Sequence, residues 1–346
     1  MARNETKPSG LTVKILALVL AFLLPGIGIL SVMRPVLALQ VSIPLPLPWA
    51  AGLPVYDHVV IVVEENKDYE QIIGNKNASY INDVLRKEGA SLTKCYGEEH
   101  HSEGNYFWLF SGGNQHVGFT DKIPSRDLTT GNLGEGLIHA GHSFKGYSEG
   151  LPEIGSMVAE EGLYARKHVP WVSFSNVPRG KTVADSSNLR FPQDFPSDYD
   201  SLPTVSFVIP NLVNDMHNGS TQPAIGAGDK WLRQHIDGYY KWAKQHNSLL
   251  ILTFDENSQF SFTGGVTDPG DKDPKKANHI VTIFAGAHIK PGDYAEEKGV
   301  THVNVLRTLE AMYKLSRSGS QQFNALKAGI ADDYLIKDVF ETIDPR

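Results

Sequence analysis

Two continuous apolar runs, each ending in a pair of acidic residues, constrain the fold of this chain more than any other feature. The first, HVVIVVEEN, spans His58–Asn66, and the second, SLLILTFDEN, spans Ser248–Asn257. Uninterrupted aliphatic runs of this length are typical of strands that are buried on both faces of a parallel sheet. Segments with helical spacing alternate with these and other strand-like runs. The sequence therefore predicts an α/β fold, a three-layer α/β/α sandwich with a largely parallel central sheet.

The remaining elements follow from local patterns of apolar, capping and turn residues. Further strands are predicted at 90–97, 143–149, 169–177, 204–211 and 278–286. Helices are predicted at 79–89, 106–110, 152–162, 228–245 and 301–315.

The N-terminus has the pattern of an export signal. Basic residues precede the apolar stretch Ile15–Met33, and the small-residue pattern at 36–38 is a candidate cleavage site. We therefore expect residues 1–38 to be a signal peptide or N-terminal anchor and 39–54 to be a Pro-rich linker, leaving 55–346 as the catalytic domain. The protein is expected to be secreted, periplasmic or extracellular. An uncleaved segment would anchor it and keep it near a membrane.

Charge and cysteine content narrow the class of protein further. The 346-residue chain has a formal net charge of −7, so no nucleic-acid partner is expected. Its one cysteine, Cys95, cannot form an intrachain disulfide. The sequence leaves the oligomeric state open.

Acidic residues recur at the ends of the predicted strands. Glu65 and Asn66 follow the first run, Asp255 and Glu256 follow the second, and Asp215 follows the strand at 204–211. The carboxyl ends of parallel strands form one edge of a sheet, where ligands bind. Carboxylates that converge there predict a divalent-metal site of a hydrolytic kind, with Zn, Ca, Mg or Mn as the candidate ion.

The stretch HHSEGNYFWLFSGG, His100–Gly113, places a serine just before an aromatic helix. A helix N-terminus favours an anion, so Ser102 is a candidate nucleophile for a phosphoryl group. Asn105 is placed to donate a hydrogen bond to a phosphoryl oxygen. The alternative is that Ser102 only caps the helix.

Histidines complete the candidate site. His217 and His279 are predicted to act in catalysis, and His302 is either a site residue or part of a helix start. His100, His101 and His168 are expected to include at least one phosphate-facing residue.

Six sequence blocks, in order, resemble the bacterial phosphoesterase family of secreted acid phosphatases, phosphoinositide phosphatases and phospholipases C, within the alkaline-phosphatase-like superfamily. The blocks are VEENKDYEQIIG, HHSEGNYFWLFSG, FVIPNLVNDMHNG, LTFDEN, NHIVTIFAGAHIKPG and THVNVLRTLEAMYKL. AGHSFKGYSEGLP and YARKHVPWVSFSNV resemble segments of the phosphatase branch. The likeness covers about Tyr56–Leu315.

This resemblance implies an alkaline-phosphatase-like fold and a role for each matched residue. The implied metal ligands are Glu65, Asn66, Ser102, Asp215, Asp255 and Glu256. We further expect Ser102, Asn105, His217 and His279 to act in catalysis, and Asn66, His101 and Asn105 to bind the substrate. Together they predict a metal-dependent phosphatase that hydrolyses phosphate monoesters, small or lipidic, through a phosphoserine intermediate.

Two departures from the family pattern keep alternatives open. His101 and Gly104 replace prolines around the serine, which would loosen the loop or widen it for another substrate. After Glu256 the sequence NSQFSF lacks the Gly-Gly-Phe and later Asp-His of the phospholipase branch. A phospholipase C-type phosphodiesterase and a non-catalytic phosphate-binding surface protein remain the alternatives.

Overall fold

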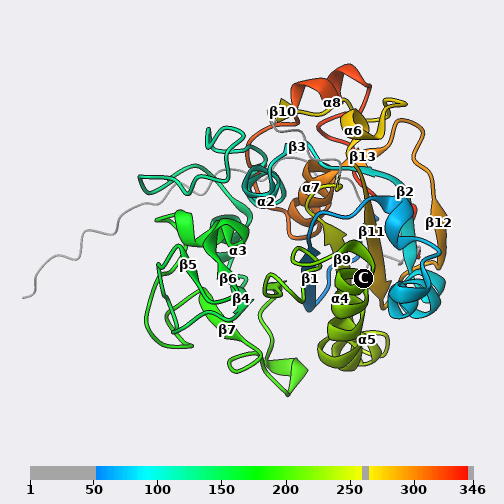
Figure 1. Ribbon diagram of the computed structural model, residues 1–346. Helices are drawn as coiled ribbons and strands as arrows, with labels where there is room; N and C mark the ends of the chain where they lie inside the picture. Colours follow the sequence, from blue (N-terminus) through cyan, green and yellow to red (C-terminus); the bar gives the residue numbers. More distant parts are fainter. Residues whose placement is uncertain (1–51, 259–264, 342–346) are drawn as a thin grey trace, which may run out of the picture. The chain divides into compact units, whose positions relative to one another are not determined.

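The computed structural model describes residues 52–258 and 265–341, and within them nine strands form one sheet (Figure 1). In spatial order the strands are β12 (Gly292–Tyr294), β2 (Ala90–Tyr96), β11 (His279–Gly286), β9 (Ser248–Phe254), β1 (His58–Glu64), β8 (Val205–Ile209), β4 (Phe144–Glu149) and β7 (Asn188–Phe191), with β13 (Val300–Thr301) paired to β2. Two short antiparallel pairs lie outside it: β3 (Glu99–His100) with β10 (Gly265–Val266), and β5 (Glu160–Glu161) with β6 (Tyr164–Ala165).

The sheet is mostly parallel, which confirms the predicted fold class. The central strand β1 pairs in parallel with both β8 and β9. Of the described strands in this sheet, only β11 runs against its neighbours, β2 and β9. Because β1 and β9 are parallel and in register, with Glu64 opposite Phe254, their acidic ends emerge side by side.

Helices cover both faces of the sheet. They are α1 (Tyr69–Ile72), α2 (Ser102–Ser111), α3 (Leu133–His139), α4 (Thr221–His235), α5 (Asp237–Ala243), α6 (Pro274–Ala277), α7 (His302–Met312) and α8 (Phe323–Lys327). Shorter turns are a π-helix at Ile81–Arg86 and 3-10 helices at Lys76–Ala78, Arg166–His168, Pro170–Ser173 and Tyr199–Ser201. α2 packs on α3 and α7, whereas α4 and α5 pack on each other on the near face in Figure 1.

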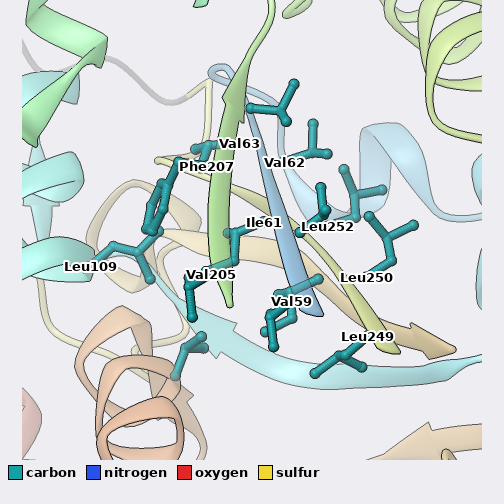
Figure 2. Close-up of a cluster of buried hydrophobic side chains, with 14 of the residues drawn as sticks. Val59, Ile61, Val62, Val63, Leu109, Val205, Phe207, Leu249, Leu250 and Leu252 are labelled. Atoms are coloured by element: carbon teal, nitrogen blue, oxygen red, sulfur yellow. The ribbon is translucent and has the colours of Figure 1, made fainter. Parts of the chain in front are cut away.

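The core forms where aliphatic strand residues meet helix side chains. Figure 2 shows Ile61 of β1 and Phe207 of β8 beside Leu109 of α2. On the other face, the Tyr239 hydroxyl of α5 donates a 3.0 Å hydrogen bond to the Leu249 carbonyl oxygen of β9. Apolar burial on both faces explains why β1 and β9 are uninterrupted aliphatic runs.

Some predicted elements differ in the structure. Residues 169–177 contain the 3-10 helix Pro170–Ser173 and no strand of the main sheet, because Pro170 lacks a backbone N–H and favours a first helical turn. No helix forms at 152–162, and the predicted helix at 228–245 is divided at Ile236 between α4 and α5. Asp237 and Gly238, which follow this division, are weak helix formers.

The predicted signal, and all of the predicted linker except residues 52–54, lie outside the described residues. Among the residues that are described, none of the helices combines the length and the hydropathy that crossing a membrane requires. The division into signal, linker and catalytic domain stays a prediction.

Truncating a buried side chain of the central strand β1 should destabilise the protein. Ile61 is fully buried between Phe207 and Ile251. Ile61→Ala is expected to lower the free energy of unfolding by about 2–5 kcal/mol, because it removes buried methyl groups and leaves a cavity. Urea denaturation measures this. Val266→Ala, at a side chain that is 51% exposed, should change it by less than about 0.5 kcal/mol, and an equal loss in both variants would contradict the core assignment.

Candidate active site

Ser102 lies between acidic residues from two neighbouring strands. It is the first residue of α2 and only 1% exposed. Its hydroxyl Oγ is 3.0 Å from Glu65 Oε2 and 3.3 Å from Glu256 Oε1, in hydrogen bonds that the serine donates. The predicted nucleophile and the two predicted acidic strand ends therefore meet in one buried cluster.

The turn after β1 brings the next ligand candidates into the same cluster. Asn66 adopts a left-handed conformation, with φ 33°, which asparagine tolerates better than most residues. Its backbone N–H donates to Asp255 Oδ1 at 3.1 Å, and its Nδ2 donates to Glu256 Oε1 at 3.0 Å. The loops that follow β1 and β9 are thus joined through side chains.

Asp215 reaches the cluster from the loop after β8. Its carbonyl oxygen accepts the Glu65 N–H at 2.7 Å, and its carboxylate Oδ1 accepts the His217 N–H at 2.8 Å. The other oxygen, Oδ2, lies 3.7 Å from His168 Nδ1. All six predicted metal ligands, Glu65, Asn66, Ser102, Asp215, Asp255 and Glu256, are consequently neighbours in this structure.

His168, one of three histidines expected to include a phosphate-facing residue, lies in this cluster, together with Tyr106, which the sequence did not single out. His168 is fully buried, with Nε2 3.2 Å from Glu65 Oε1, and its ring stacks on Tyr106 at 5.0 Å. The Tyr106 hydroxyl donates a 2.7 Å hydrogen bond to Glu65 Oε1. A buried tyrosine hydroxyl usually needs a polar partner, and this is the signal by which the sequence could have pointed to Tyr106.

Several atoms of the cluster have no hydrogen-bond partner within the part of the chain that the structure describes. They are Asp215 Oδ2, Asp255 Oδ2, Asn66 Oδ1 and His168 Nε2. Burial raises the pKa of Glu65 and of Asp215 well above the ordinary range. Burial also raises the pKa of Glu256 to about 7. Burying carboxylates without partners costs free energy, and a bound cation would offset their mutual repulsion.

The donor atoms match a cation in kind. Carboxylate, amide and hydroxyl oxygens suit Mg²⁺, Ca²⁺ or Mn²⁺, and a neutral His168 would add a nitrogen ligand. Burial, together with the charge of Lys167, lowers the pKa of His168 well below its usual value, so its imidazole is neutral. In the described residues no group of three or more His, Cys, Asp or Glu side chains is already arranged to hold a metal ion. Binding would therefore require side chains of the cluster to turn.

A second set of residues holds the cluster in place. His100 Nδ1 is 2.5 Å from Glu256 Oε2, and the neighbouring charge of Glu256 raises the pKa of His100 although burial lowers it. His302 bridges Glu98 Oε2, at 2.7 Å, and the Phe254 carbonyl oxygen, at 2.8 Å. His302 thus ties the segment before the serine to the end of β9, without contacting Ser102.

Asn105 and His279 have other surroundings than predicted. Asn105 Oδ1 accepts the N–H groups of Glu98 and Glu99, and its Nδ2 donates to the Glu99 carbonyl oxygen at 2.6 Å. Asn105 therefore braces the turn before Ser102. His279 stacks on Tyr69 at 4.3 Å, and its Nε2 lies 2.9 Å from the Thr93 carbonyl oxygen. The structure does not bring His279 into the Ser102 cluster.

His101 and Gly104, which replace prolines of the family pattern, leave the serine loop tightly packed. His101 precedes α2 with φ 38°, and its Nδ1 is 3.9 Å from Asp121 Oδ2. A Cβ atom at Gly104 would overlap Glu99 Oε1, so a side chain there would require the Glu99 carboxylate to move. The expectation of a loosened loop has no support in this packing.

His217 lies beside His168, with ring centroids 6.2 Å apart.

Known proteins resemble this chain over most of its length. A sequence model of the Phosphoesterase family matches residues 85–316. Phosphatidylinositol-3-phosphatase of Mycobacterium tuberculosis is 46% identical over 271 residues, covering 78% of this chain and 81% of that protein. The phosphate-repressible acid phosphatase of Penicillium chrysogenum is 30% identical, over 76% of this chain and 60% of that protein.

Solved structures share the fold at low sequence identity. A protein of the alkaline phosphatase superfamily from Vibrio parahaemolyticus has a TM-score of 0.52 at 12% identity, covering 84% of this chain and 73% of that chain. The lipoteichoic acid synthase LtaP from Listeria monocytogenes has a TM-score of 0.50 at 10% identity, covering 78% and 75%. These likenesses support the alkaline-phosphatase-like fold that the sequence predicted.

The acidic cluster should make stability depend on pH and cations together. The folded metal-free protein holds protons on groups such as Glu256 that the unfolded chain releases near its ordinary pKa of 4.5. The contribution of Glu256 to stability is therefore greatest below that value and falls as pH rises towards about 7, since the folded state binds more protons over this range. A divalent cation bound in the cluster would replace these protons, so its stabilising effect should grow between about pH 5 and about pH 7.

Thermal melts with a chelator and with added Mg²⁺, Ca²⁺, Mn²⁺ or Zn²⁺ measure this effect. Glu256→Gln should reduce the loss of stability between about pH 5 and about pH 7, because one titrating carboxyl group is removed. If no added cation changes the melting temperature at about pH 7, the result would contradict a metal site in this cluster.

Proposed function

The chain belongs to the Phosphoesterase family, and we propose that it is an exported metal-dependent phosphatase that hydrolyses phosphate monoesters through Ser102. One observation carries the proposal: the buried Ser102 hydroxyl donates hydrogen bonds to carboxylates from two parallel strands. A serine held only as a helix cap would instead accept N–H groups of its own helix. The names of the relatives, all phosphatases, favour hydrolysis of phosphate esters over binding alone.

The metal is part of the proposal. The residues that would hold it are Glu65, Asn66, Ser102, Asp215, Asp255 and Glu256, with His168 as an additional donor. When bound, a divalent cation lowers the pKa of a nearby hydroxyl and neutralises charge on a phosphoryl group. Asp215 Oδ2 and Asp255 Oδ2, buried and without hydrogen-bond partners among the described residues, are the atoms that most need such a counter-charge.

Ser102 Oγ attacks phosphorus in line with the leaving alkoxide. The bond from Oγ to phosphorus forms, the bond from phosphorus to the alkoxide oxygen breaks, and the serine proton passes to Glu65 or Glu256, which already accept it. The N-terminus of α2 stabilises the negative charge on the phosphoryl oxygens.

Water then hydrolyses the phosphoserine. We assign the proton transfers of the alkoxide and the water to His217, which is half-buried beside His168. His217 gives a proton to the alkoxide and takes one back from the attacking water. Phosphate leaves, and Ser102 regains its proton from the carboxylate.

Phosphate monoesters are the proposed substrate class, with a lipid phosphomonoester of the phosphoinositide type as one member. The relative of 46% identity is named for a phosphatidylinositol phosphate, and the relative of 30% identity for acid phosphatase activity. Export rests on the N-terminal pattern, Ile15–Met33 followed by a small-residue site. N-terminal sequencing of the protein recovered outside the cytoplasm tests whether residues 1–38 are removed.

Removing the nucleophile tests the chemistry. Ser102→Ala is expected to lower kcat for p-nitrophenyl phosphate by at least about 10³-fold, because no other hydroxyl in the described ranges bonds both Glu65 and Glu256. Asp255→Ala should lower kcat by at least about 10²-fold, through loss of the charge that holds the cation. Ser111→Ala is the matched control, since this serine sits at the other end of α2 and bonds the Phe107 carbonyl oxygen.

Retained turnover in both Ser102→Ala and Asp255→Ala would refute the proposed mechanism. Each assay is repeated with every divalent ion after chelation. Release of diacylglycerol from phosphatidylcholine, without hydrolysis of p-nitrophenyl phosphate, would identify a phospholipase C instead. Phosphate binding without turnover under any ion would identify a binding protein.

A further inference from the structure

A carboxylate from a distant loop sits beside the nucleophile. Asp121 lies between α2 and α3 in a left-handed conformation, with φ 50°. Its Oδ1 accepts the Glu103 N–H at 2.9 Å, and its Oδ2 lies 2.9 Å from Lys167 Nζ. One carboxylate oxygen of Asp121 therefore contacts a backbone amide in the first turn of α2, and the other contacts the ammonium group of Lys167.

Lys167 lies in the same 3-10 turn, Arg166–His168, as a residue of the cluster around Ser102. The next residue, His168, places its buried Nε2 3.2 Å from Glu65 Oε1, and this nitrogen has no hydrogen-bond partner among the residues that the structure describes. The charges of Glu65 and Asp121 raise the pKa of Lys167 although burial lowers it. Lys167 is thus a positively charged group that lies within electrostatic range of the acidic cluster.

A second lysine beside the cluster is differently placed. Lys67 is 6% exposed, and its ammonium donates to the carbonyl oxygens of Met216, at 2.7 Å, and Asn66, at 3.0 Å. Those contacts hold Lys67 inside the protein. The side chain of Lys167 is 20% exposed and is paired with a loop carboxylate instead. Lys167 can therefore exchange its partner for an anion that arrives from solvent.

We propose that Lys167 binds the phosphoryl group of the substrate, and that the Asp121 carboxylate takes the place of that group in the free protein. This inference rests on the proposed phosphatase function. A phosphate monoester has terminal oxygens that can accept from both the Lys167 ammonium and the Glu103 N–H, the two donors that Asp121 now uses. It also has more negative charge than a carboxylate, so it competes effectively for an ammonium ion.

The obvious alternative is an ion pair that only anchors the loop. In that case Lys167→Met and Asp121→Asn break the same contact and should affect the protein in the same direction. If Asp121 instead competes with phosphate, the two variants act in opposite directions. Removing the lysine then weakens phosphate binding, whereas neutralising the aspartate strengthens it. Asparagine still accepts the Glu103 N–H, so the turn is preserved.

The experiment measures binding of inorganic phosphate to the full chain, by calorimetry and as competitive inhibition of p-nitrophenyl phosphate hydrolysis. Lys167→Met should weaken phosphate binding by at least about tenfold, the effect of losing one charge-assisted hydrogen bond. Lys167→Arg should stay within about threefold of the wild type, because the positive charge is kept. Asp121→Asn should tighten binding by about threefold or more, since the competing charge is gone.

Lys181→Met is the matched control. Lys181 forms an exposed ion pair with Glu153 at 3.6 Å, so its loss should leave phosphate binding within about twofold of the wild type. The melting temperature of every variant shows whether it is folded. Asp121→Asn and Lys167→Met should differ in phosphate affinity even if both melt at the same lowered temperature.

Weaker phosphate binding in both variants, or unchanged binding in both, would overturn the inference. Such a result with normal turnover by the wild type leaves the proposed function intact. If the wild type hydrolyses no phosphate ester, the proposed function fails, and the calorimetric measurement still decides whether Lys167 binds phosphate. A wild type that binds no phosphate overturns the inference as well.

Discussion

The burial of carboxylates around one serine hydroxyl is the constraint on which the rest of this structure depends. Glu65 and Asp255 leave neighbouring parallel strands at the same edge of the sheet, and Asp215 joins them from the loop after β8. Like charges in a dry environment repel one another, so the folded chain holds them in a protonated form or needs a cation among them. The aliphatic strands bury enough apolar surface to sustain such a site, because both faces of β1 and β9 are covered.

Much of the surrounding polar network serves to keep this cluster in position. Asn105 closes the turn before the serine by bonding the backbone of Glu98 and Glu99. His302 joins that turn to the end of β9 through Glu98, a buried carboxylate whose other oxygen accepts the Val303 N–H. These contacts fix where the Ser102 hydroxyl lies relative to Glu65. They explain why some polar residues of the matched sequence blocks support the site without touching the proposed phosphoryl group.

Positive charge enters the site in two different ways. Lys67 is fixed beside the carboxylates by backbone carbonyl oxygens of Asn66 and Met216. Lys167 is paired with a loop carboxylate that also contacts the first turn of α2. Lys67 therefore stabilises the fold of the site, whereas Lys167 is the lysine that we propose binds the phosphoryl group of the substrate. The sheet edge supplies negative charge for a cation, while the helix start and Lys167 supply positive charge for an anion.

The sequence by itself determined the parallel strands, their acidic ends and the position of the serine, because these features are local. An aliphatic run predicts a buried strand, and residues directly after such strands share an edge of the sheet. Glu65, Asn66, Asp255 and Glu256 could therefore be placed together from the pattern of residues alone.

Only the tertiary structure decided the partners of His168, Tyr106, Asp121 and His279. These depend on how loops and short helices pack across the sheet edge. His279 has the same kind of neighbours in sequence as a site histidine, yet its ring stacks on Tyr69. His168 lies in a segment predicted to lead into a strand, and it enters the cluster because Arg166–His168 forms a 3-10 turn there. Contacts between residues far apart in the chain are set by packing, which has no local signature in sequence.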